Sequence, residues 1–139
     1  MTRFVLDASV SLRWFLDRSV PPYANRIKQL LIGGSLATVP ALWHLEMANG
    51  LVVAHRRGVL TSSDVDQSLV YLEQLLAQMI ESDAPLVSIR QSLLTARKFQ
   101  LSSYDAAYLE TAQRGNLPLA TLDQPLRAAA KQAGVAIVT

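Results

Sequence analysis

The sequence has no cysteine among its 139 residues, and it has only two histidines. The absence of cysteine excludes disulfides, thiolate metal sites and cysteine nucleophiles. The histidines, His44 and His55, stand eleven residues apart, which corresponds to about 16 Å along a helix and is too far for them to share one ion. Any metal ion must therefore be held by oxygen ligands.

The sequence also lacks a long apolar run. Its longest stretch without Asp, Glu, Lys or Arg, residues 29–45, contains Gly33, Gly34 and Pro40, and it falls short of the ~20 apolar residues that a membrane span needs. The apolar run at residues 4–6 is too short for a signal peptide. We therefore expect a soluble, cytoplasmic protein without a membrane segment.

Short apolar runs alternate with longer amphipathic segments along the chain, a pattern typical of α/β proteins. Strands are expected at residues 4–6, 36–39, 117–122 and 135–138, and residues 85–87 are interpreted as a short strand or a loop. Helices are expected at residues 10–16, 22–32, 41–57, 61–79, 88–99, 103–114 and 123–133. The pattern predicts one domain over residues 1–139, an α/β three-layer αβα sandwich around a short, mostly parallel sheet.

Four acidic residues are expected at one edge of this sheet. Asp7 follows the first strand, Asp123 follows the third, and Asp105 lies in the first turn of the helix that precedes the third strand. Glu46 lies about five residues into the helix after the second strand, and its long side chain leans back toward the start of that helix. In parallel sheets, ligands bind beyond the carboxyl ends of the strands, which is where these acids meet.

Each acid also has a purely structural interpretation. Asp7 and Asp123 can cap the helices that follow them, and Asp105 can favour its helix dipole. Glu46 lies among apolar residues, where an ionised carboxylate costs several kcal/mol unless a cation such as Arg13 pairs it or a metal coordinates it. Four neighbouring carboxylates cannot all ionise at neutral pH unless a cation is present. Their conjunction therefore favours a Mg²⁺ or Mn²⁺ site and hydrolysis of nucleic acid.

Three segments resemble a PIN domain of the VapC type, the toxin ribonucleases of bacterial toxin–antitoxin pairs. They are residues 4–10 (FVLDASV), 103–109 (SYDAAYL) and 117–123 (LPLATLD), with Glu46 between the first two. The resemblance covers essentially the whole chain. It implies an endoribonuclease that cleaves RNA with a metal-activated water.

The resemblance also implies roles for individual residues. Asp7, Glu46, Asp105 and Asp123 match the acidic quartet that holds Mg²⁺ or Mn²⁺. Ser9 and Thr121 match small hydroxyl positions beside the metal pocket, Asn49 matches a polar position one turn beyond the glutamate, and Arg13 stands where a basic residue lies near the scissile phosphate or braces a carboxylate.

Partners follow from the same resemblance. It implies a homodimer and a cognate VapB-type antitoxin whose C-terminal segment wraps the toxin. The apolar surfaces of helices 10–16 and 22–32 are expected to supply the groove for that segment.

Two alternatives remain open. One is a non-toxin PIN nuclease that acts on other RNA or on single-stranded DNA, and the other is a PIN-like binding module without catalysis.

The net charge of +2 weakly favours a polyanionic partner. If four of the 11 acids surround a metal, the remaining 7 face 13 Lys and Arg, and the rest of the protein carries +6. Such a surface attracts phosphates.

Overall fold

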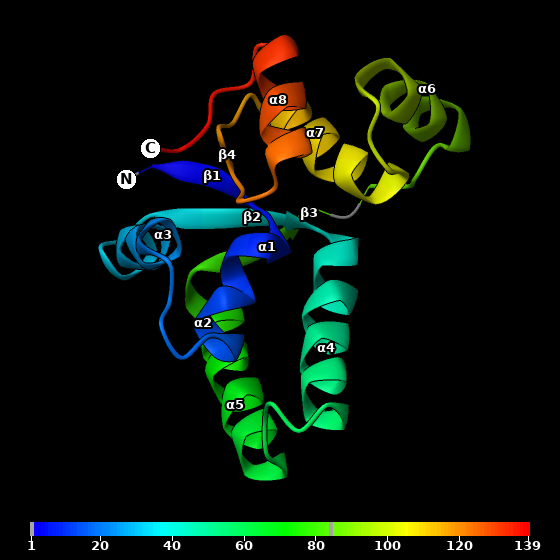
Figure 1. The fold of residues 1–139 in the computed structure, drawn as a ribbon. Coiled ribbons are helices and arrows are strands. Elements are labelled where there is room, and N and C mark those ends of the chain that lie inside the picture. Colours follow the sequence, from blue (N-terminus) through cyan, green and yellow to red (C-terminus); the bar gives the residue numbers. More distant parts are fainter. Residues whose placement is uncertain (1, 84) are drawn as a thin grey trace.

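The computed structural model describes residues 2–83 and 85–139, so Met1 and Ala84 of the expected domain lie outside the described residues. The strands in this part are β1 (Arg3–Leu6), β2 (Leu36–Pro40), β3 (Ile80–Asp83) and β4 (Leu119–Ala120). The helices are α1 (Ala8–Ser11), α2 (Arg13–Leu16), α3 (Pro22–Ile32), α4 (Ala41–Arg56), α5 (Ser62–Gln78), α6 (Ile89–Phe99), α7 (Ser103–Gly115) and α8 (Gln124–Gln132) (Figure 1). Within these residues, no helix is long and apolar enough to cross a membrane.

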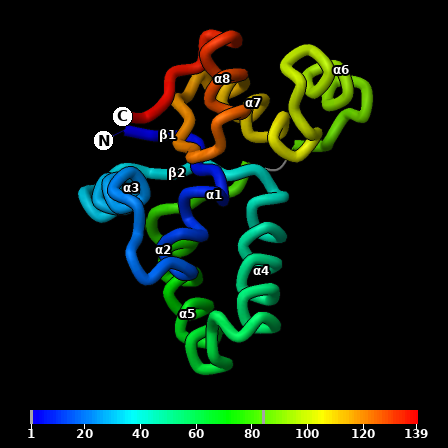
Figure 2. The backbone as a smooth tube through the Cα atoms, viewed as in Figure 1, coloured from blue at the N-terminus to red at the C-terminus, as the bar shows by residue number. Residues whose placement is uncertain are grey.

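The strands form one parallel sheet in the order β3-β2-β1-β4. Val5 of β1 pairs with Thr38 of β2 on one side and with Leu119 of β4 on the other. The helices that precede β3 lie on one side of the sheet, and those that follow it lie on the other side (Figures 1 and 2). The predicted αβα sandwich is thereby confirmed, and the carboxyl ends of the strands meet at one edge.

The expected strand at 117–122 is shorter in the structure, and the one at 135–138 is reduced to a parallel bridge between Leu119 and Ile137. The strand at 117–122 ends early because of how the backbone N–H groups after Ala120 are hydrogen-bonded. The N–H groups of Leu122 and Asp123 donate to side-chain hydroxyls rather than to a neighbouring strand, and this ends β4. The helix expected at 10–16 is likewise two short helices, α1 and α2.

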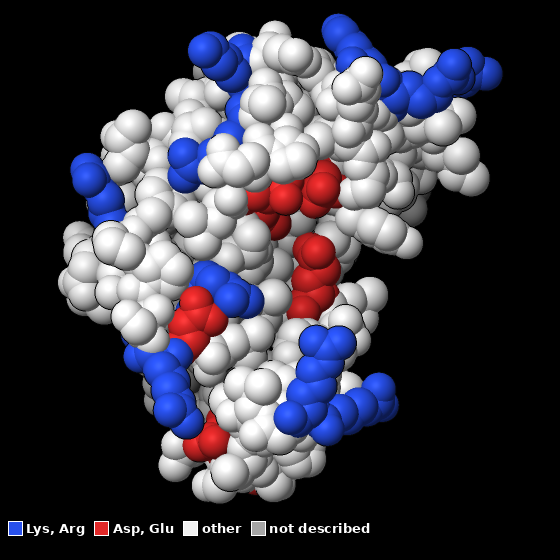
Figure 3. Space-filling view, in the orientation of Figure 1, with Lys and Arg blue, Asp and Glu red and all other residues white. Residues whose placement is uncertain are grey.

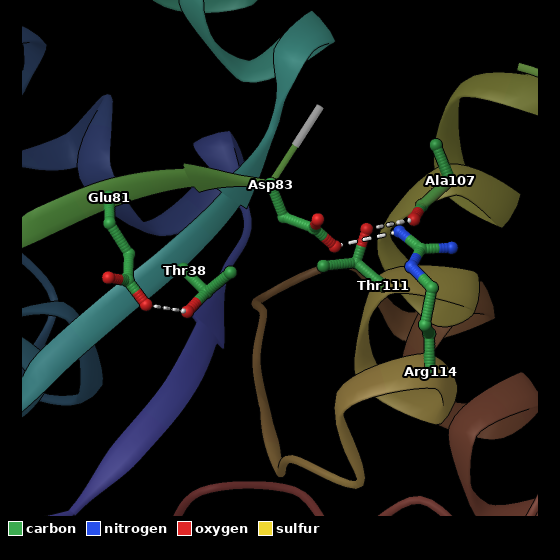
Figure 4. Close-up of polar contacts among 6 residues, drawn as sticks. All are labelled: Thr38, Glu81, Asp83, Ala107, Thr111 and Arg114. Carbon is green, nitrogen blue, oxygen red and sulfur yellow. Dashed lines mark hydrogen bonds and ion pairs between the residues drawn. The ribbon is translucent and has the colours of Figure 1, made fainter. Parts of the chain in front are cut away.

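The edge strand β3 was not expected, and residues 85–87 form no strand. Its sequence, Ile-Glu-Ser-Asp, has one buried apolar side chain and no alternating pattern. Polar contacts hold it in place (Figure 4): Thr38 Oγ1 donates to Glu81 Oε1 at 3.2 Å, and Arg114 Nη2 donates to Asp83 Oδ2 at 2.8 Å. The second contact joins the end of β3 to α7.

Helix α4 is held tightly against α1. Trp43 is 1% exposed, and its Nε1–H donates to Ser11 Oγ at 3.0 Å, while the Ser11 hydroxyl donates to Met47 Sδ at 3.1 Å. Gly50 permits the close approach, because a Cβ atom there would lie 2.4 Å from Leu12 Cδ2. These contacts fix the position of α4, the helix that carries Glu46.

Candidate metal centre

The four predicted acids lie on different elements at the carboxyl ends of the strands. Asp7 directly follows β1 and is only 4% exposed. Glu46 lies in the second turn of α4, Asp105 in the first turn of α7, and Asp123 immediately before α8, all three half-buried. The structure therefore places each acid at the edge of the sheet where the sequence predicted it.

Helix capping accounts for only one of the three aspartates. The Asp123 carboxylate accepts a hydrogen bond from the Leu126 N–H at 2.9 Å and caps α8. Asp7 occupies the N-cap position of α1 without a side-chain capping bond. On α7 the cap is Ser102, whose Oγ accepts from the Asp105 N–H at 3.0 Å. The carboxylates of Asp7 and Asp105 are thus not explained by helix capping.

Two hydroxyl groups surround the Asp7 carboxylate. Ser9 Oγ donates to Asp7 Oδ2 at 2.6 Å, and Thr121 Oγ1 donates to the same oxygen at 2.7 Å. The same two hydroxyls accept the N–H groups of Leu122 and Asp123, each at 3.0 Å. They orient Asp7 and also join the end of β1 to the segment that carries Asp123.

Glu46 is paired with a tyrosine that sequence reasoning did not single out. The hydroxyl of Tyr108 donates to Glu46 Oε1 at 2.5 Å and accepts from the Ala8 N–H at 3.3 Å. Tyr108 is fully buried, one turn after Asp105 on α7. A sequence signal did exist, because a tyrosine on the apolar face of a helix needs a partner for its hydroxyl.

The acids affect one another electrostatically. Burial is the main cause that raises the pKa of Asp7, of Glu46 and of Asp105 above their usual values. The charge of Asp123 raises the pKa of Asp7 and of Asp105 further, and the charges of Asp7 and Asp105 raise that of Glu46. Hydrogen bonds oppose these effects at Asp7 and Glu46. Burial likewise raises the pKa of Tyr108, which therefore stays protonated and remains a donor.

The carboxylate groups of the four acids do not point to one common position that an ion could occupy. Within residues 2–83 and 85–139, no group of three or more Asp, Glu or His side chains is arranged so that it could hold a metal ion. Glu46 is directed to Tyr108, and Asp123 to the start of α8. Acidic side chains nevertheless gather at the centre of the face in Figure 3, and Lys and Arg side chains lie around its periphery.

The remaining predicted residues lie outside this carboxylate network. Arg13 braces a carboxylate, but that carboxylate belongs to Asp17, with an Nη1–Oδ1 distance of 2.8 Å. Asn49 is exposed on α4, one turn beyond Glu46. His44 is not one of the predicted site residues, and its Nε2 lies 2.6 Å from Ser82 Oγ.

An apolar groove of about 1030 Å³ lies between α6, α7 and the start of α4; we call it the α6–α7 groove. Its lining includes Leu86, Ile89 and Tyr104, which are 100%, 85% and 68% exposed. The side chains on helices 10–16 and 22–32, by contrast, pack mainly against the core; Trp14 and Tyr23 are examples. This groove lies beside Asp105, while Ile32 at the end of α3 is a large apolar side chain of helix 22–32 that stays 55% exposed.

Comparison with known proteins places this geometry in context. A family model described as PIN domain matches residues 4–132. The crystal structure of PAE2754 from Pyrobaculum aerophilum has 23% identity and a TM-score of 0.70, with 99% of this chain and 84% of that chain covered. The structure of FitAcB from Neisseria gonorrhoeae has 20% identity and a TM-score of 0.66, with 98% and 96% covered. No curated protein matches the sequence significantly.

Proposed function

The chain belongs to the PIN domain family, and on this basis we propose that it is a Mg²⁺- or Mn²⁺-dependent endoribonuclease whose metal is held by Asp7, Glu46, Asp105 and Asp123. PIN domains are typically metal-dependent nucleases, so the chain is assigned to the phosphodiester hydrolases. The observation that carries the finer proposal is that the four acids lie at the carboxyl ends of the strands, with Asp7 buried and the other three half-buried.

The donor set suits a hard divalent cation. Carboxylate oxygens are the ligands that Mg²⁺ and Mn²⁺ prefer, and the chain offers no thiolate. Holding several carboxylates ionised in this partly buried place costs free energy, which a cation offsets. Glu46 accepts from Tyr108 through Oε1, and Asp123 accepts from the Leu126 N–H through Oδ2, so a cation would be held through the second oxygen of each carboxylate.

The residues around the acids have distinct tasks. A bound divalent cation supplies Lewis acidity toward the phosphodiester and acidifies water. The hydroxyls of Ser9 and Thr121 favour the ionised form of Asp7, since hydrogen bonds to a carboxylate stabilise its charge. Their bonds to the Leu122 and Asp123 backbone keep that segment at a set position relative to Asp7.

RNA is the proposed substrate. The basic side chains around the acidic centre in Figure 3 favour a polyanion. The resemblance to VapC-type domains supports RNA over DNA, although the metal chemistry itself does not need the 2′-hydroxyl.

We expect the purified chain to cleave single-stranded RNA with Mg²⁺ or Mn²⁺, and excess EDTA to lower the rate at least ~10³-fold, because water loses its activation. The measurement is cleavage of an RNA and a DNA strand of the same sequence, followed on gels. Cleavage of DNA alone would support the single-stranded DNA alternative. Cleavage of neither, by a protein that binds Mn²⁺, would support the non-catalytic module.

The biological role that we propose is the toxin of a VapBC-type pair in the cytoplasm. Induced synthesis of the chain is then expected to arrest bacterial growth, and Asp105→Asn at the same protein level is expected to leave growth normal, because it removes a metal ligand. The measurement is culture density with immunoblotting of both proteins. Normal growth despite active wild-type nuclease would instead support a non-toxin PIN nuclease.

A cognate VapB-type antitoxin and a second copy of the chain are the proposed protein partners. The resemblance to VapC-type domains supports both. The α6–α7 groove supports a protein contact on this side of the molecule, because it exposes large apolar side chains such as Leu86 and Ile89.

A further inference from the structure

The hydroxyl of Tyr108 joins three elements at the candidate metal centre. The ring is fully buried on α7, and the hydroxyl is its only polar atom. It donates to Glu46 Oε1 on α4 at 2.5 Å, and it accepts at 3.3 Å from the N–H of Ala8, the residue that follows Asp7. One phenol therefore contacts the helix that carries Glu46 and the segment that carries Asp7.

We propose that Tyr108 is a positioning residue that sets the Glu46 carboxylate relative to Asp7 for binding of a divalent cation. The inference rests on the proposed metal centre. A glutamate side chain has three rotatable bonds, whereas a buried tyrosine ring has two and is held by packing, so the rigid partner restricts the mobile one. Residues that hydrogen-bond to metal ligands orient them in this way, and their loss typically weakens metal affinity 10–100-fold.

A purely structural role for the same hydroxyl makes a different prediction. If the contact serves only to give a buried phenol a partner, its removal lowers the stability of the fold and leaves metal affinity unchanged. If Tyr108 positions Glu46, its removal weakens metal binding in a protein that is still folded. Metal affinity therefore separates the two roles.

The experiment is calorimetric titration of the metal-free protein with Mn²⁺, for the wild type and for Tyr108→Phe, Tyr104→Phe and Asp7→Asn. Tyr104 is the matched control, since it lies on the same helix and is 68% exposed. We expect the Kd for Mn²⁺ to rise about 10–100-fold in Tyr108→Phe and to change less than about twofold in Tyr104→Phe. Asp7→Asn is expected to lose binding.

The outcomes distinguish this inference from the proposed function. If Asp7→Asn binds Mn²⁺ like the wild type, or if the wild type does not bind it, the proposed metal centre fails and Tyr108 has no ligand to position. If Asp7→Asn loses binding while folded Tyr108→Phe keeps the wild-type Kd, only the positioning role is overturned. A Glu46→Ala background adds a direct check: Tyr108→Phe should change the Kd there less than about twofold, because its target is gone.

A measurement on the wild-type chain covers the case in which Tyr108→Phe does not fold. The chain has four tyrosines, so a protein labelled with ¹³Cζ tyrosine gives few resonances to assign. Mg²⁺ titration is expected to shift the Tyr108 resonance with the same saturation curve as calorimetry and to leave that of Tyr104 in place. An unmoved Tyr108 resonance at saturating Mg²⁺ would overturn the positioning role.

Discussion

Replacement of Asp7 by asparagine is expected to lower Mg²⁺-dependent RNA cleavage at least ~10³-fold, equivalent to about 4 kcal/mol of transition-state stabilisation. Asparagine has the size of aspartate but no negative charge for a cation. Its amide oxygen can still accept from the hydroxyls of Ser9 and Thr121, which donate to Asp7 Oδ2 in the wild type. The rate should be measured in single turnover, with substrate and Mg²⁺ saturating for the wild type.

The same variant is expected to be at least as stable as the wild type in metal-free buffer at neutral pH. Burial raises the pKa of Asp7 above its usual 3.8, so the ionised carboxylate destabilises the folded state relative to the unfolded state. Asparagine carries no such penalty. As the pH falls through the raised pKa and below 3.8, Asp7 becomes neutral in both states and the advantage of the variant disappears. Thermal unfolding in EDTA across this pH range measures the difference.

If Asp7→Asn loses cleavage activity but not stability, Asp7 is retained for function rather than for folding. The control is Asp66→Asn, because Asp66 is exposed on α5, away from the carboxyl ends of the strands, and should change neither quantity. Wild-type cleavage by Asp7→Asn would remove Asp7 from the catalytic centre. A large fall in its melting temperature would assign Asp7 a structural role instead.

Replacement of Trp43 by alanine is expected to lower the free energy of unfolding by about 3–5 kcal/mol. That is a large part of the 5–15 kcal/mol typical of a whole domain. Trp43 is 1% exposed, and its indole is hydrogen-bonded to Ser11, so the variant loses apolar burial and leaves a cavity between α4 and α1. Urea denaturation followed by circular dichroism measures the change.

Two further variants separate volume from hydrogen bonding. Trp43→Phe keeps an aromatic ring but leaves the Ser11 hydroxyl without its indole donor, so a smaller loss of about 1–2 kcal/mol is expected. Tyr104→Ala removes an exposed ring and should change stability by less than about 0.5 kcal/mol. A loss below about 1 kcal/mol in Trp43→Ala would contradict the anchoring role of this side chain.

Most helices and strands could be predicted from the sequence because the residues that mark their ends are close to them in the chain. Helix α3 begins at Pro22, and α5 is opened by a capping box between Thr61 and Asp64, both readable from neighbouring residues. The buried strand β1 is an apolar run that ends at an acid. The edge strand β3 has no such signal, because contacts with β2 and α7 hold its polar residues in place.

The sequence by itself determined which acids lie at the same edge of the sheet, since in a parallel βα fold the segments that follow the strands come to one edge whatever the details of packing. Only the tertiary structure decided how each acid is held. Glu46 and Tyr108 are 62 residues apart and Asp7 and Thr121 are 114 apart, so no local pattern records either contact. These partners are chosen by the docking of α4 and α7 on opposite faces of the sheet, and that docking is a property of the packed core rather than of any one segment.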